Sequence, residues 1–368
     1  MVTVRVPLVE KRDASYDILI APGLVHQLDT ILQEYCPAAA YALISDSHVG
    51  KLYGEGLVKQ LSAIGYRVEL LTFPAGEWNK TRETWASLSD RMLAAHFGRD
   101  CAVIALGGGV VNDVAGFVAA TYLRGVPLVQ VPTSLLAMID SSIGGKTGVD
   151  VPAGKNLLGA FHQPRVVVAD PELLASLASV QLAAGLAEAV KHGAIADAEY
   201  FAFLEAEYAA IFAKHAPALE RLVRRSVEIK AAVVAQDERE QGRRAILNFG
   251  HTVGHAIEAT SKFEVLHGEA VAVGMVYEGR LAESLGIATA GTAGRIQAVL
   301  ERLHLPVERP DGSHVDALIA AMRTDKKVRE GEIRLALPRA IGSAHGDESH
   351  GWTVGVSEAA IRQVLVNT

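Results

Sequence analysis

The 368-residue chain has little cysteine, no excess of positive charge and no long uncharged hydrophobic run. Cys36 and Cys101 lie far apart and form no CxxC pattern, so we predict reduced thiols rather than a disulfide framework. The net charge of −7 argues against binding to nucleic acid or to an anionic membrane surface. The N-terminus lacks the apolar segment of a signal peptide. We therefore predict a cytoplasmic enzyme or binding protein without a membrane partner.

The first half of the chain alternates strand-like and helix-like segments. Apolar runs indicate strands at 41–47, 67–73, 101–109 and 126–134, and helical periodicity indicates helices at 55–65 and 81–98. Such alternation predicts an α/β fold with a largely parallel sheet and helices on both faces.

The pattern changes after about residue 175, where segments rich in Ala, Leu and Glu repeat with helical periodicity. Helical patterns continue through 251–262, 267–285 and 291–303, and only 332–338 has an extended pattern. The polar segment 342–351 is predicted to be a loop. We expect two domains: a nucleotide-binding α/β domain at 1–175 and a mostly helical domain at 176–368.

A glycine cluster follows one buried strand, in the stretch LGGGVVNDVAGFVAATYLRG (106–125). Gly107, Gly108 and Gly109 would let backbone N–H groups approach a pyrophosphate at a helix N-terminus. The pattern differs from GxGxxG because Asn112 stands at the third glycine position, so a tight turn without a ligand remains an alternative. Asp113 either caps the helix or contacts a ribose or nicotinamide.

Two further glycine-containing segments carry lysines. Lys146 directly follows Gly144 and Gly145, and Lys155 and Asn156 occur in PAGKNLLGAFHQP (152–164). A solvated lysine is the commoner case, although a lysine beside a glycine turn suits a phosphate. Together the two segments favour a phosphorylated ligand.

The stretch LNFGHTVGHAIE (247–258) contains two histidines four residues apart, His251 and His255, which share one face of a helix. Thr252 stands where a metalloprotease HExxH motif has glutamate, which excludes that class. His267 and Glu188 are candidates for the remaining ligands of a metal such as zinc. A salt bridge between Glu188 and Lys191 is the structural alternative for that carboxylate.

These stretches together resemble the 3-dehydroquinate synthase family of the sugar-phosphate cyclases. The matching motifs also include PTSLLAMIDSSIGGKTGV, GLAEAVKHG, LHGEAVAVGM and DKK (325–327), in the order and spacing of the family from about 74 to 338. The resemblance implies a homodimer that uses NAD+ and zinc or cobalt. It implies conversion of 3-deoxy-D-arabino-heptulosonate 7-phosphate, a small-molecule sugar phosphate, to 3-dehydroquinate and phosphate. The steps are oxidation, β-elimination, reduction, ring opening and an intramolecular aldol reaction in the shikimate pathway.

The resemblance also assigns roles to individual residues. It implies metal ligation by Glu188, His251 and His267, while His255 matches a position near the substrate phosphate. The substrate positions are Asp140, Lys191, Lys230, Arg244 and Asn248, and the phosphate-side positions are Lys146, Asn156 and Lys326 or Lys327. Arg124 matches an arginine contributed across the dimer interface. The cofactor positions are Asp46, Glu77, Gly107, Gly108, Gly109, Asp113, Thr133, Ser134, Lys146 and Lys155.

The sequence departs from the family pattern at Asn112, His48 and Ser134, all within the cofactor segments. Another sugar-phosphate cyclase, of the valiolone or inosose type, is the nearest alternative function. Such enzymes generally differ at the carboxylate- and phosphate-side residues that are present here. A metal-dependent alcohol or glycerol dehydrogenase is a second alternative, and it would release NADH in net amounts. A non-catalytic regulator would be expected to lack some of the ligands.

Overall fold

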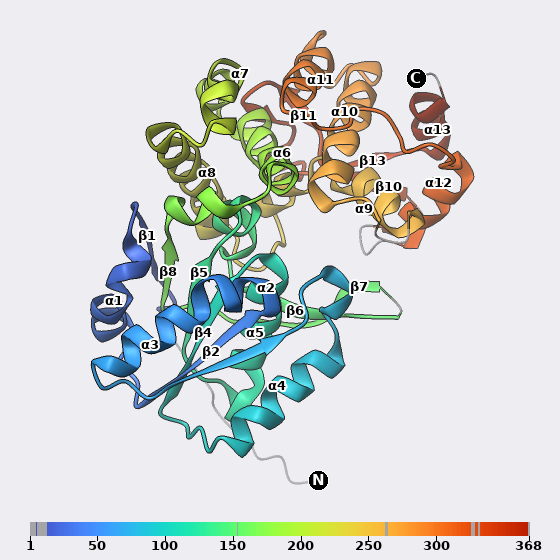
Figure 1. Ribbon diagram of the computed structural model, residues 1–368. Helices are drawn as coiled ribbons and strands as arrows, with labels where there is room; N and C mark the ends of the chain where they lie inside the picture. The colour runs from blue at the N-terminus through green and yellow to red at the C-terminus, as the bar shows by residue number, and fades with distance from the viewer. Residues whose placement is uncertain are drawn as a thin grey trace, which may run out of the picture.

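The structure is a computed structural model that describes residues 5, 13–152, 154–261, 264–324, 328–329 and 332–366. Its first half contains a six-stranded sheet, and its second half is mostly helical. Figure 1 shows the sheet half below and the helical half above it. None of the helices described is long and apolar enough to cross a membrane. Cys36 and Cys101 are buried free thiols, which confirms that prediction.

The large sheet is parallel throughout, as predicted. Its order is β1-β8-β5-β4-β2-β3, and all five neighbouring pairs run in the same direction. The strands are β1 (Asp17–Ile20), β2 (Ala40–Asp46), β3 (Val68–Phe73), β4 (Cys101–Gly107), β5 (Leu128–Pro132) and β8 (Val166–Ala169).

Helices cover both faces of this sheet. They are α1 (Leu28–Tyr35), α2 (Ser47–Val49), α3 (Glu55–Ala63), α4 (Arg82–Ala94) and α5 (Gly109–Thr121). Tyr41 and Leu43 of β2 pack in the same apolar cluster as residues of α1 and α3, whereas Ala42 and Ile44 pack with α4 and α5. Side chains alternate between the faces of a strand, so a fully apolar strand such as β2 must be covered twice.

A two-stranded antiparallel hairpin projects from the first half. It consists of β6 (Lys146–Val151) and β7 (Gly154–Phe161), where the sequence indicated glycine-rich loops. Gly148 and Gly159 lie opposite each other, and a Cβ atom on Gly159 would lie 2.1 Å from the carbonyl oxygen of Thr147. These glycines therefore permit strand pairing, which local sequence patterns did not reveal.

The second half contains eight helices among the residues that the structure describes. They are α6 (Ser179–Ala196), α7 (Ala198–Phe212), α8 (Ala216–Gln236), α9 (His251–Thr260), α10 (His267–Ser284), α11 (Thr292–Arg302), α12 (Val315–Thr324) and α13 (Glu358–Val366). Small strands follow at β9 (Val328–Arg329), β10 (Glu332–Leu335), β11 (Pro338–Ala340), β12 (Ser343–Ala344) and β13 (Val354–Val356). The extended pattern at 332–338 thus contains β10 and the start of β11. The predicted loop 342–351 includes the two-residue strand β12.

Buried apolar residues from both halves form one continuous cluster, which reaches from Val25 to Leu305. The domain boundary near residue 175 stays a prediction because packing is continuous across it.

Helices α9 and α10 approach each other at backbone distance. A Cβ atom on Gly274 would lie 1.9 Å from the carbonyl oxygen of Gly250, and one on Gly254 would lie 3.1 Å from that of Ala270. Gly250 directly precedes α9 and adopts the left-handed conformation, with φ of 80°. These contacts fix the relative positions of the two helices whose first residues are His251 and His267.

Candidate active site

Three potential metal ligands converge from three helices of the second half. Glu188 lies in the middle of α6, whereas His251 and His267 are the first residues of α9 and α10. The Nε2 atom of each histidine lies 3.5 Å from Oε1 of Glu188. One ligand atom from each residue can be chosen so that all three lie within 4.8 Å of one another. The structure thus brings together the three residues for which the sequence suggested metal ligation.

Hydrogen bonds on the outer side of each imidazole set its orientation. Nδ1 of His251 lies 3.1 Å from the carbonyl oxygen of Phe249, and Nδ1 of His267 lies 3.4 Å from Oε2 of Glu258. Both partners are acceptors, so Nδ1 carries a proton in each ring. When the rings are neutral, Nε2 therefore directs its lone pair toward Glu188, as metal coordination requires.

The charges around Glu188 favour a cation. Neither of its buried oxygens accepts a hydrogen bond among the described residues, although Lys191 forms an ion pair with it. Burial would raise the pKa of Glu188, but Lys191 and the two histidines hold it well below its usual value. Burial would lower the pKa of His267, yet Glu258 and Glu188 raise it to about 10. One carboxylate and two imidazoles fit a divalent metal such as zinc, and the salt bridge that the sequence offered as an alternative exists beside them.

Two other groupings of potential ligands overlap with this cluster. His255, Glu258 and His267 form one, and Asp140, Glu188 and His192 form the other. Metal binding by the set of Asp140, Glu188 and His192 is disfavoured by positive charge, because Lys191 and Lys230 both contact Asp140. In the first, Nδ1 of His267 already faces Glu258, which leaves Nε2 for the cluster at Glu188. We therefore favour the set of Glu188, His251 and His267.

Asp140 joins two buried lysines next to these ligands. It lies in the single helical turn 137–141, and its Oδ1 atom is 2.6 Å from Nζ of Lys230 and 4.0 Å from Nζ of Lys191. Lys230, on α8, also donates to the backbone oxygen of Asp140 at 2.6 Å. Burial lowers the pKa of Lys230 to about 8, while Asp140 opposes this shift and Lys191 adds to it. The arrangement concentrates positive charge that suits an anionic substrate.

The segment between α8 and α9 supplies a second polar group. Both terminal nitrogens of Arg244 donate to the carbonyl oxygen of Gly144 at 3.3 Å, which joins the helical half to the glycine turn before β6. Asn248 donates to Oε1 of Glu240 at 2.6 Å, and the other oxygen of Glu240 forms an ion pair with Lys146. Glu240 was missed by sequence reasoning because it lies in a highly charged segment without a motif. Its contacts with two candidate substrate residues place it in the same site.

The candidate cofactor residues meet at the carboxyl edge of the parallel sheet. Asp46 ends β2, and the neighbouring strand β4 leads into Gly107, Gly108 and Gly109. The chain leaves these two strands in opposite directions across the sheet, since β3 lies beyond β2 and β5 beyond β4. Ligands of α/β sheets bind at such switch points. Asp46 itself accepts hydrogen bonds from the N–H groups of His48 and Val49, both at 2.8 Å.

The three glycines at the end of β4 differ in whether packing leaves room for a side chain. A Cβ atom on Gly107 would lie 2.5 Å from a methyl carbon of Val111, so packing requires this glycine. A Cβ atom on Gly108 would come no closer than 3.5 Å, to Oγ of Ser134, and one on Gly109 no closer than 3.4 Å, to Oγ of Ser141. Packing therefore leaves room at Gly108 and Gly109, and the missing side chains would let a ligand approach the backbone closely. This edge fits a dinucleotide.

Ion pairs link the cofactor segments to one another. Asp113 does not cap α5; it pairs instead with the buried Lys80 at 2.5 Å. Lys155 lies 3.2 Å from Oε1 of Glu77, the first residue of the short helical turn 77–79 that precedes α4. Thr133 is linked to the glycine cluster because its N–H donates to the carbonyl oxygen of Gly107 at 2.9 Å. Lys80 was not identified from the sequence, since its partner is 33 residues away.

Comparison with known proteins agrees with this geometry. Models of the 3-dehydroquinate synthase N-terminal and C-terminal regions match residues 70–184 and 185–328. The chain is 50% identical over 331 residues to a 3-dehydroquinate synthase of Symbiobacterium thermophilum, covering 89% of this chain and 92% of that one. The chain belongs to the 3-dehydroquinate synthase family. It is an enzyme of this family, and its α/β and helical halves are as the resemblance implied.

Solved structures of related cyclases share the fold. A 2-epi-5-epi-valiolone synthase from Streptomyces hygroscopicus subsp. jinggangensis 5008, with NAD+ and Zn2+ bound, is 33% identical with a TM-score of 0.88 and 98% coverage of both chains. A 2-deoxy-scyllo-inosose synthase complexed with carbaglucose-6-phosphate, NAD+ and Co2+ is 27% identical with a TM-score of 0.86 and 95% coverage of both.

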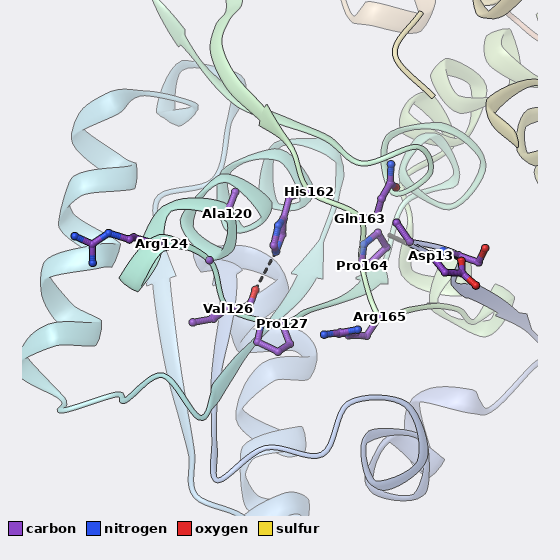
Figure 2. A pocket seen from close by; sticks show the side chains of 12 residues that line it. Asp13, Ala120, Arg124, Val126, Pro127, His162, Gln163, Pro164 and Arg165 are labelled. Carbon is purple, nitrogen blue, oxygen red and sulfur yellow. Dashed lines mark hydrogen bonds between the residues drawn. The ribbon is translucent and has the colours of Figure 1, made fainter. Parts of the chain in front are cut away.

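Among the described residues, Arg124 is a family-derived residue that lies apart from the assembled site. Lys326 and Lys327 lie outside the described residues. Arg124 is exposed, and it has no ion pair within the part of the chain that the structure describes. It contributes to the lining of a separate cavity of about 340 Å³ together with His162 and Arg165. Figure 2 shows its guanidinium group directed away from His162 and the rest of this cavity.

Proposed function

We propose that the chain is a 3-dehydroquinate synthase that uses NAD+ and a divalent metal, zinc or cobalt. It converts 3-deoxy-D-arabino-heptulosonate 7-phosphate to 3-dehydroquinate and phosphate. The convergence of His251 and His267 on buried Glu188, beside the cationic group around Lys230 and Arg244, is the observation that carries this proposal. Close sequence relatives with this activity support it.

The absent groups would be held by residues already described. Glu188, His251 and His267 would hold the metal, which supplies Lewis acidity toward a substrate hydroxyl. The glycine turn after β4 would hold the pyrophosphate of NAD+, which supplies reversible acceptance of hydride.

The protein's own charged side chains would bind and orient the substrate. Lys230 and Arg244 would hold the carboxylate end, because a guanidinium group offers two parallel donors. Asp140 contacts both Lys230 and Lys191, and the burial of Lys191, Lys230 and Arg244 shields their charges from water. Positioning one flexible intermediate in this way provides much of the rate enhancement.

The phosphate end would lie toward the β6–β7 hairpin. Lys146 and Asn156 would hold the phosphate, with His255 close by as a group able to exchange a proton. Lys146 is already paired with Glu240, so the incoming phosphate competes with that carboxylate for the ammonium group. Glu240 also holds Asn248, so this exchange would change the contacts of two substrate residues.

Turnover assays test the proposal directly. Purified protein with NAD+, Zn2+ and the heptulosonate phosphate is expected to release phosphate and form dehydroquinate with no net NADH. Turnover of sedoheptulose 7-phosphate in its place would assign the chain to the valiolone branch. Net NADH from a simple alcohol would indicate a dehydrogenase.

We also propose a homodimer in which Arg124 serves the partner's site. Three consecutive residues, Leu123, Arg124 and Gly125, have positive φ values of 47°, 71° and 114°. Such backbone strain at two non-glycine residues is costly and often serves function. The exposed guanidinium group is available to a second copy of the chain.

Mixing of two variant subunits distinguishes an Arg124 that acts in the partner's site from one that acts in its own subunit. Arg124→Ala and Lys230→Ala chains are each expected to be nearly inactive. Mixed dimers would contain one intact site if Arg124 acts across the interface, so activity is expected to return on mixing. Failure to recover activity, with mixed dimers confirmed by mass spectrometry, would contradict the shared site.

A further inference from the structure

Glu258 is a buried carboxylate that ends the stretch LNFGHTVGHAIE but has no role in the proposed mechanism. It lies on α9, seven residues after His251, and only 2% of its surface is exposed. An ionised group at this depth is costly unless charged or hydrogen-bonding partners compensate. Its partners therefore indicate why it is there.

The two carboxylate oxygens of Glu258 point to different partners. Oε2 faces Nδ1 of His267 at 3.4 Å, while the opposite ring nitrogen of His267 lies 3.5 Å from Glu188. Oε1 of Glu258 lies 2.9 Å from Nζ of Lys155. A chain of contacts thus runs from a lysine, through Glu258 and His267, to the metal cluster.

The contact with Lys155 connects the two halves of the molecule. Lys155 lies on β7, and its ammonium group is also 3.2 Å from Glu77, at the cofactor edge of the sheet. Glu77 and Glu258 thus hold the same lysine from the sheet half and from the helical half. Of these two carboxylates, Glu258 contacts a candidate metal ligand, His267, whereas Glu77 has no such contact among the described residues.

We propose that Glu258 is a positioning residue that orients His267 for the metal and fastens the β6–β7 hairpin to helix α9 through Lys155. A carboxylate behind a metal-bound histidine fixes the ring orientation and the tautomer and increases the basicity of the coordinating nitrogen. Glu258 is in the correct place for this because it faces the nitrogen opposite Glu188. The inference rests on the metal site of the proposed function.

Binding of Co2+ to the metal-free protein tests this role without relying on turnover. The visible absorption of bound Co2+ reports ligand geometry, and its titration gives the affinity. Glu258→Gln is expected to weaken Co2+ binding by about 10- to 100-fold, the range known for partners of metal-bound histidines, and to shift the cobalt spectrum. It is also expected to lower kcat more than it raises KM for the sugar phosphate.

Glu77→Gln is the matched control, because Glu77 shares Lys155 but not His267. This variant is expected to weaken NAD+ binding while Co2+ affinity and spectrum stay as in the unchanged protein. Lys155→Met should likewise leave the cobalt spectrum in place. Equal cobalt effects in Glu77→Gln and Glu258→Gln would overturn the proposal.

A further comparison separates positioning from direct ligation and from misfolding. Complete loss of Co2+ in both His255→Ala and Glu258→Gln, with retention in His251→Ala, would place the metal elsewhere and refute the role. Glu258→Asp keeps the charge and should recover part of the affinity in a folded protein. Failure of the unchanged protein to bind Co2+ would refute the metal site itself, whereas Co2+ binding without dehydroquinate formation would contradict only the proposed reaction.

Discussion

The two halves of the molecule build their parts of the site by different means. The sheet half offers backbone at glycine turns, where Gly108 and Gly109 leave space that packing does not need. The helical half offers charged side chains removed from solvent, among them Glu188 and Lys230, which are 0% and 5% exposed. Adding a side chain to a glycine should therefore weaken ligand binding by the sheet half. The helical half should be most sensitive to the loss of a charge or of a metal ligand.

The largest effect is expected at the proposed metal ligands of the helical half. His251→Ala should lose bound metal and turnover together, because Nε2 of His251 faces Glu188 directly. His255→Ala should keep the metal and lose turnover. Metal content measured by mass spectrometry on both purified variants checks this division, and loss of metal in the His255 variant alone would reverse it.

Substitution of a closely packed glycine in the helical half should lower the stability of the fold rather than the affinity for NAD+. Gly274→Ala would place a methyl group 1.9 Å from the carbonyl oxygen of Gly250, so we expect destabilisation by about 3 kcal/mol. Gly294→Ala on α11 meets no atom within 4 Å and should stabilise by about 0.5 kcal/mol. Urea unfolding compares them, and equal midpoints would show that α9 and α10 can separate without cost.

At Gly108, in the glycine turn after β4, a substitution should change the affinity for NAD+ rather than the stability of the fold. Gly108→Ala is expected to weaken NAD+ binding by about tenfold, equivalent to about 1.4 kcal/mol, with an unchanged melting temperature. Gly107→Ala should lower the melting temperature, since its methyl group would contact Val111 at 2.5 Å. Calorimetric titration with NAD+ measures the first effect. Unchanged affinity in Gly108→Ala would show that this glycine does not face the cofactor.

The smallest expected change is a shift in a pH profile. Lys230, with its pKa lowered to about 8 by burial, should lose its charge above that pH, so kcat/KM should fall. Asp140 raises this pKa, and Asp140→Asn should therefore move the alkaline limb to lower pH. An unmoved limb would assign it to another group.

The same depressed pKa has a consequence for stability. Between about pH 8 and the ordinary value of 10.5, the unfolded chain binds a proton at Lys230 that the folded chain does not. The contribution of Lys230 to the free energy of unfolding should therefore increase with pH across this window. Urea unfolding at several pH values, with Lys230→Met as the control, measures this contribution.

Local patterns predicted the parts of the fold that depend on neighbours in sequence. The strand at 101–109 appears as β4, and the helices predicted at 55–65 and 81–98 appear as α3 and α4. The hairpin formed by β6 and β7 was not predicted, because its paired glycines resemble loops until the facing strand is known.

In the candidate site, too, local patterns predicted residues within motifs but not contacts between distant segments. Helical spacing and the motifs indicated His251, His267 and Glu188, since each lies in a recognisable local pattern. The pairing of Lys146 with Glu240 spans 94 residues and involves a charged segment without periodicity, so only the folded chain reveals it. Lys326 and Lys327 stay predictions.

The backbone contact between α9 and α10 has a consequence for redesign of this enzyme. A side chain at Gly274 would collide with the carbonyl oxygen of Gly250, and one at Gly254 would crowd that of Ala270, so the two helices would have to move apart to admit either. Attempts to broaden the range of accepted sugar phosphates should therefore leave the helix pair intact. Randomised libraries have more freedom at exposed positions of strand β7 such as Leu157 and Leu158, which are 40% and 42% exposed and hold none of the candidate metal ligands.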